Sequence, residues 1–309
     1  MIFINMTLAG ILFLIIATVC AAMFSVAFKI FHRKDIDSQQ AIFFNYLIAF
    51  VMGVLFSLHG EVVVNPFKAS WLVPVIILGF IFMAGMVLLS ESTRRVGVAI
   101  STVCSRASMV IPIIVSYLMI QGSDKPKWLL ICLVLVSMTL TVWTGKQESG
   151  HKITVMDILA PLSVFIAFGA SNSFLKVLQH KVTVADTAAG LSQQAINSEL
   201  SLVTASVFFV AMIICSYSFF TKDENGKRAP IRFKNILGGA ALGLINYFCT
   251  YTLMLAMKTI DSSLLFPLHN IGIVAIGALV GMWAFHETMK PHQILGMVLA
   301  AVSIALLCI

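Results

Sequence analysis

Apolar residues form long runs along this chain, and short polar stretches separate them. Each run is close to the roughly 20 residues that an α-helix needs to cross a bilayer. The runs lack the period-two alternation of membrane strands, so we predict an all-α polytopic membrane protein. The ten predicted spans cover residues 7–30, 40–59, 70–91, 96–120, 127–145, 156–178, 195–220, 235–257, 260–284 and 292–309.

The spans repeat in a way that predicts two related halves. An offset of 165 residues lays Lys125-Pro126, before the fifth span, on Lys290-Pro291, before the tenth. It also places the third span on the eighth and the fourth on the ninth. Five spans is an odd number, so the second copy must enter the membrane from the opposite side, as in secondary transporters built from inverted repeats. We predict five-helix repeats at 1–147 and 148–309, around a central cavity.

Composition excludes a water-soluble class. The chain is 60% hydrophobic and 11% charged, whereas soluble proteins are about 45–50% apolar and about 25% charged. The net charge of +7 is spread over many short junctions, which argues against nucleic-acid binding. Thirteen of the 20 lysines and arginines follow odd-numbered spans. The positive-inside rule then favours both termini outside.

Arg106 is the first candidate for chemistry, because it is the only charged residue between Val96 and Gly122. An arginine at mid-membrane costs about 2.5–3.5 kcal/mol on insertion scales, so such residues usually face water or a partner. We interpret Arg106 as an anchor for a carboxylate or phosphate. The alternatives are a permanent ion pair with Glu91, or a cap on broken-helix carbonyls near Pro112.

Further candidates are polar residues within the sixth, eighth and ninth spans. The ninth span is the best companion for Arg106, because the repeat alignment sets its "FPLHNIG" segment opposite that residue. The expected substrate-binding set comprises Arg106, Asn172, Lys176, Asn246, Tyr247, Tyr251, His269 and Asn270. Each has a structural alternative: Lys176 could snorkel to the interface, the amide and phenols could tie helices together, and a lone histidine is more often structural.

The C-terminal third resembles the EamA-type proteins of the drug/metabolite transporter superfamily. The resemblance extends over nearly the whole chain and depends on a polar turn into a span, an internal proline, small residues, an exit glutamate and a glycine in the last span. These are Asp261-Ser262-Ser263, Pro267, Gly272, Gly277, Gly281, Glu287 and Gly296. The resemblance implies ten helices, a central cavity and alternating access for small polar metabolites. It also implies cytoplasmic termini, against the charge count, and the orientation stays open.

The sequence therefore predicts a secondary transporter of a small polar or anionic metabolite in the cell (inner) membrane. We expect no cofactor and a monomer or weak homodimer. The alternatives are an intramembrane enzyme or a channel-like facilitator. The enzyme lacks support because His286 and His292, on either side of Glu287, do not have zinc-site spacing. Glu199 is the best candidate for a buried acid that could couple transport to protons.

Overall fold

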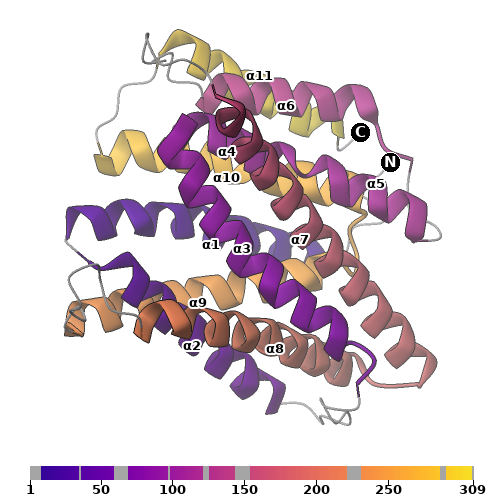
Figure 1. The fold of residues 1–309 in the computed structure, drawn as a ribbon. Helices are drawn as coiled ribbons and strands as arrows, with labels where there is room; N and C mark the ends of the chain where they lie inside the picture. The colour runs from indigo at the N-terminus through magenta and orange to yellow at the C-terminus, as the bar shows by residue number, and fades with distance from the viewer. Residues whose placement is uncertain are drawn as a thin grey trace. The chain divides into compact units, whose positions relative to one another are not determined.

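The computed structural model describes residues 8–34, 36–58, 69–96, 98–120, 125–142, 154–220, 231–285 and 290–307. Within them the chain is entirely helical, which confirms the predicted class. The helices are α1 (Leu8–Arg33), α2 (Ser38–Leu58), α3 (Leu72–Val96), α4 (Val98–Ala107), α5 (Val110–Met119), α6 (Trp128–Val142), α7 (Val155–Ala188), α8 (Gln193–Phe220), α9 (Phe233–Ala256), α10 (Ser262–Phe285) and α11 (Pro291–Leu307). Figure 1 shows their order.

The helices reproduce the ten predicted spans within these ranges. Seven helical segments are long and apolar enough to cross a membrane, and α4 and α5 together form one of them, at Ile100–Met119. Three shorter apolar segments, Leu8–Phe24, Trp128–Val142 and Pro291–Ser303, account for the first, fifth and tenth spans. The chain is a polytopic α-helical membrane protein.

The helix of the fourth span is interrupted between Ala107 and Val110, although no glycine lies there. Pro112 lacks an N–H and its ring clashes with the carbonyl four residues earlier, at Ser108. The backbone tightens there: Met109 N–H donates to the Arg106 carbonyl at 3.2 Å, and Ile111 N–H donates to the Ser108 carbonyl at 3.0 Å. This agrees with the alternative that placed broken-helix carbonyls near Pro112, whereas α10 runs through Pro267 without a break.

The sixth span is longer than predicted. We expected it to end near residue 178, but α7 is a 34-residue helix that continues to Ala188. At 1.5 Å per residue its length is about 51 Å. Gly190, at φ 73°, ends it, and the Leu191 N–H closes back on the Asp186 carbonyl at 3.0 Å, a helix-terminating arrangement typical of glycine. Asp186, predicted in a junction, is therefore helical.

The described chain divides into two compact units that do not follow the sequence halves. Unit 1 comprises residues 1–12, 84–177 and 259–309, and unit 2 comprises 13–83 and 178–258. Each unit takes segments from both predicted repeats. The repeats at 1–147 and 148–309 stay a prediction from the sequence.

Unit 2 is built on α2, which packs most extensively against α8 and α9 (Figure 1). Glycines allow these helices to approach closely. A Cβ on Gly243 of α9 would lie 2.6 Å from the Asn45 carbonyl oxygen of α2, and a Cβ on Gly53 of α2 would lie 2.7 Å from the Cβ of Ala205. The unit core consists of Tyr46, Ala49, Phe208, Ala211, Cys215 and Tyr247.

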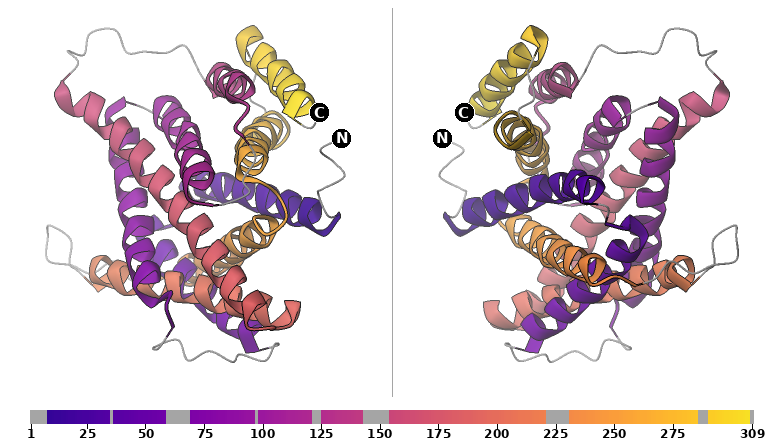
Figure 2. Two further views of the ribbon diagram at one scale, coloured as in Figure 1. Left: turned by 90° about the vertical axis from the view of Figure 1, so that its right-hand side faces the viewer. Right: turned by 90° about the vertical axis from the view of Figure 1, so that its left-hand side faces the viewer.

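In unit 1, α6 and α11 lie side by side, as both views of Figure 2 show. These are the two helices that the 165-residue offset aligns. A Cβ on Gly296 of α11 would lie 2.6 Å from the Thr141 nitrogen of α6, so glycine is needed there as well. Gly277 differs, because a Cβ there would meet nothing within 4 Å. Gly277 is therefore not required for close helix packing.

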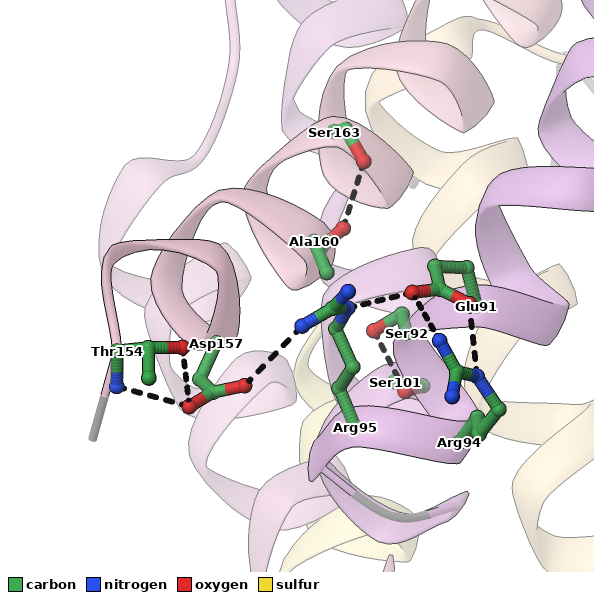
Figure 3. A network of polar contacts seen from close by, with 9 residues as sticks. All are labelled: Glu91, Ser92, Arg94, Arg95, Ser101, Thr154, Asp157, Ala160 and Ser163. Carbon is green, nitrogen blue, oxygen red and sulfur yellow. Dashed lines mark hydrogen bonds and ion pairs between the residues drawn. The ribbon is translucent and has the colours of Figure 1, made fainter. Parts of the chain in front are cut away.

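A polar network in unit 1 ties the end of α3 to the start of α7 (Figure 3). Arg95 donates to Glu91 on α3 and its Nη1 lies 3.9 Å from Asp157 Oδ1 on α7. Asp157 also accepts hydrogen bonds from the Thr154 N–H and hydroxyl, at 2.8 and 2.7 Å. This is a capping-box arrangement, with Thr154 at the N-cap and the acid three residues later. It fixes where α7 begins.

Candidate functional site

Arg106 occupies the last turn of α4, directly before the break in the fourth span. Carbonyls at a helix C-terminus carry partial negative charge, so a cation is favoured there. The neighbouring hydroxyls bond to carbonyls of the same turn: Ser105 Oγ donates to Thr102 O at 2.9 Å, and Ser108 Oγ donates to Ser105 O at 2.6 Å. The side chain of Arg106 is half-buried and its Nε is fully buried. The guanidinium is therefore inside unit 1.

His269 of α10, the predicted companion of Arg106, lies in the same unit. Its side chain is 7% exposed. The next residue, Asn270, is also buried and its Nδ2 donates to the Phe266 carbonyl at 3.0 Å. Part of the amide of Asn270 is thus used within its own helix.

The carboxylate considered as a permanent partner of Arg106 has other partners. Glu91 accepts hydrogen bonds from Arg94 Nε at 2.9 Å and from Arg94 Nη2 at 2.8 Å. It also accepts from Arg95 (Figure 3). This half-exposed glutamate lies between two cations of its own helix.

Lys176 lies inside unit 1, 7% exposed, and does not extend to the surface as the snorkelling alternative expected. The negative charge that acts on it is Asp261, just before α10. Asp261 also caps α10, because its Oδ1 accepts the Ser263 N–H at 2.8 Å. Asn172, one turn before Lys176, is half-buried. Unit 1 therefore contains two cationic residues of the predicted set, Arg106 and Lys176.

The three other predicted residues belong to α9 in unit 2, where neighbouring helices satisfy them. Asn246 Nδ2 donates to Asn45 Oδ1 at 3.1 Å. The fully buried Tyr247 shares a 2.8 Å hydrogen bond with Ser201. Tyr251 donates to the Asn197 carbonyl at 3.2 Å and stacks on Tyr247, with ring centroids 5.4 Å apart. These hydrogen bonds agree with the alternative in which the amide and phenols tie helices together. A role of the three residues in substrate binding stays a prediction.

Sequence reasoning missed one buried cluster in unit 2. Trp71, just before α3, donates from Nε1 to Glu199 Oε1 of α8 at 2.7 Å, and Asp186 of α7 is buried in the same unit. Glu199 was singled out as a candidate buried acid and is 7% exposed. Asp186 was assigned to a junction, and only the continuation of α7 would have indicated its burial. In the part of the chain that the structure describes, no three His, Cys, Asp or Glu side chains form a potential metal site.

The fold and spans define a polytopic membrane protein. Residues 8–143 match the model of the EamA-like transporter family, which agrees with the family resemblance found in the sequence.

Two further relatives match along nearly the whole chain. An uncharacterized protein of Haemophilus influenzae is 22% identical over 292 residues, covering 92% of this chain and 93% of its own. A crystal structure superposes with a TM-score of 0.61 at 15% identity, covering 96% of this chain and 95% of the other. The second likeness shows the fold alone.

Proposed function

We propose that this protein is a secondary transporter that moves a small anionic or polar metabolite across the cell (inner) membrane by alternating access. Arg106 anchors the negative group of the solute, and His269 and Asn270 orient it. The observation that carries the proposal is the position of Arg106: a guanidinium directly before the break in the fourth span, with its Nε buried. An arginine at this depth is costly, and binding a solute anion offsets that cost.

An anionic solute is favoured because the charges of the predicted site in unit 1 are cationic. Arg106 and Lys176 both lie on helices that contribute predicted binding residues. Lys176 is the second cation of the predicted set, and Arg106 is the better anchor because of the shape of its side chain. The planar fork of Arg106 suits a carboxylate or phosphate with two oxygens, a geometry that a lysine cannot offer.

The first experiment identifies a ligand. Purified protein is screened by thermal unfolding against amino acids, organic acids, nucleosides and sugar phosphates, because a ligand of the native state raises the melting temperature by mass action. We expect an anionic compound to stabilise wild-type protein and not Arg106→Ala. Stabilisation only by uncharged compounds, equal in both proteins, would contradict the anchor.

The second experiment measures transport of that compound into proteoliposomes. A charge-assisted hydrogen bond contributes about 1.5–3 kcal/mol, so Arg106→Ala should lower uptake about 10- to 100-fold. Arg106→Lys should recover only part of it, because the bidentate geometry is lost. Arg94→Ala is the matched control, since Arg94 is an exposed arginine in the same unit. Unchanged uptake in Arg106→Ala would remove Arg106 from the site. Counterflow of labelled solute distinguishes a carrier from a channel-like facilitator.

A further inference from the structure

Ser262 is a buried polar residue at the start of α10, in unit 1. Its side chain is 2% exposed. Among the described residues, its Oγ is one of the buried side-chain atoms that have no hydrogen-bond partner. Buried hydroxyls in native proteins almost always have a partner, because burial without one costs free energy. This hydroxyl therefore destabilises the fold unless it binds something outside the chain.

Capping of α10 does not account for Ser262. A serine often begins a helix because its hydroxyl accepts an N–H of the first turn. Here Asp261 does so instead, since its Oδ1 accepts the Ser263 N–H at 2.8 Å. The Asp261 carbonyl accepts the N–H groups of Leu264 and Leu265 at 3.1 and 2.8 Å. The start of α10 is thus satisfied through Asp261, and the Ser262 hydroxyl takes no part in it.

The backbone of the same two turns offers a further polar group. Pro267 has no N–H to donate to the Ser263 carbonyl four residues earlier, so that carbonyl loses its α-helical hydrogen bond. The helix nevertheless continues through Pro267. Leu265 and Phe266 between them are 0% and 1% exposed. The first two turns of α10 therefore place a hydroxyl and a carbonyl in surroundings that are buried in protein.

Ser262 shares a face of α10 with a residue of the predicted binding set. Ser262, Phe266 and His269 stand at i, i+4 and i+7, and each is at most 7% exposed. Asn270 follows His269 directly and is buried as well. Seven residues of helix separate Ser262 from His269 by about 10 Å along the axis. This side of α10 thus carries polar groups at two levels, and buried polar groups in membrane helices often mark a substrate path.

We propose that Ser262 is a further solute-binding residue and that it selects anions carrying a second, neutral hydrogen-bonding group such as a hydroxyl. This inference rests on the proposed transporter function. Arg106 anchors the negative group, and the Ser262 hydroxyl bonds to the neutral group. In the described conformation Ser262 is covered, so the solute reaches it when alternating access opens this part of α10. An analogue without the hydroxyl leaves Ser262 unpaired and binds less well.

The first test measures stability without any solute. Ser262→Ala removes a buried hydroxyl that has no partner, so its melting temperature should equal or exceed that of wild-type protein. Ser263→Ala is the matched control, because it makes the same exchange at the next position of the same turn, where the side chain is only half-buried. A melting temperature of Ser262→Ala clearly below that of Ser263→Ala would show that the hydroxyl makes a structural bond, and would overturn the proposal.

The second test measures selectivity in proteoliposomes. The probes are pairs of anions that differ by one hydroxyl: malate and succinate, serine and alanine, and a ribonucleoside monophosphate and its deoxyribose counterpart. For the pair that wild-type protein accepts, kcat/KM should favour the hydroxylated member by about 3- to 10-fold, the effect of one neutral hydrogen bond. Ser262→Ala should bring this ratio close to one, and Ser263→Ala should keep it.

Ser262→Cys provides a second variant with a side chain of similar size. A thiol is a much weaker hydrogen-bond donor and acceptor than a hydroxyl. The preference for the hydroxylated solute should therefore fall between those of wild-type protein and Ser262→Ala. If the alanine variant fails to fold, contrary to the stability expected of it, the proposal is already overturned. A cysteine variant with the full wild-type preference would also contradict the assigned bond.

This proposal and the transporter function fail in different ways. An unchanged preference ratio in Ser262→Ala, with uptake still lost in Arg106→Ala, would remove Ser262 from the site and leave the transporter function intact. Uptake of no compound by wild-type protein would contradict the transporter function itself, and the role of Ser262 with it. A raised melting temperature together with a lost preference is the combination that a structural role of Ser262 does not produce.

Discussion

The two compact units use their buried polar groups differently. In unit 2 the polar side chains of α2, α8 and α9 bond to one another: Asn246 to Asn45, Tyr247 to Ser201, and Asn235 Nδ2 to Gln40 Oε1 at 2.7 Å. In unit 1 the notable buried or half-buried groups carry or can carry charge, namely Arg106, Lys176 and His269. Neutral bonds between helices add modest stability, whereas charges inside a membrane protein usually mark function.

The comparison teaches that polarity within a span is not by itself a sign of a binding site. The sequence predicted binding residues in α9 and in α10 by similar reasoning. The α9 residues have partners from α2 and α8 that account for them. We therefore expect substitutions of these α9 residues to act mainly on stability. Substitutions near Arg106 should act mainly on transport.

The largest stability effect should come from Gly243→Ala. The new methyl group would lie 2.6 Å from the Asn45 carbonyl oxygen and 2.9 Å from Ile48 Cβ, so α9 would have to move away from α2. Overpacking of this kind costs about 1–3 kcal/mol. The melting temperature in detergent and the monodisperse fraction by size-exclusion chromatography measure the loss.

Gly277→Ala is the matched control, because the same methyl group would meet nothing within 4 Å on α10 of unit 1. Alanine is a better helix former than glycine by up to about 1 kcal/mol, so this variant should be equally or more stable. Equal destabilisation by the two substitutions would contradict the close approach of α9 to α2.

Tyr247→Phe should have a smaller effect and tests the role of α9 directly. It removes the hydroxyl that bonds to Ser201, while Ser201 keeps its 2.8 Å hydrogen bond to the Gly53 carbonyl. The loss should be about 1 kcal/mol. Uptake per folded molecule should stay at the wild-type level. A stable variant with strongly reduced uptake would return Tyr247 to the substrate-binding set and break the distinction between the units.

The membrane spans could be predicted because hydrophobic runs report directly on helix length in a bilayer. The hydrophobic runs do not show where the backbone of a helix is interrupted. The break before Pro112 depends on a clash with the Ser108 carbonyl, whereas Pro267 lies one turn after the start of α10 and is accommodated. Both prolines look alike in sequence.

The candidate site was predictable only in part, for a related reason. A charge within an apolar run identifies Arg106, and the repeat alignment indicated the segment that contains His269. Asp186 lies in a polar stretch that resembles a loop, so neither hydrophobicity nor charge distinguishes it from a surface acid. Its burial follows from the continuation of α7 and from the position of Glu199, which are tertiary features. The sequence pattern does not contain that information.

The smallest effect should come from Arg95→Gln, which opens the network between α3 and α7 in unit 1. Arg95 bonds to Glu91 and approaches Asp157, but its side chain is 33% exposed, and ion pairs of that kind contribute little. Asp157 keeps its two bonds from Thr154, so the start of α7 should hold. The change in melting temperature should be smaller than that of Tyr247→Phe and should vanish at high salt, because salt screens exposed charges. A larger decrease in melting temperature that does not depend on salt would mean that ion pairs stabilise unit 1, as neutral hydrogen bonds stabilise unit 2.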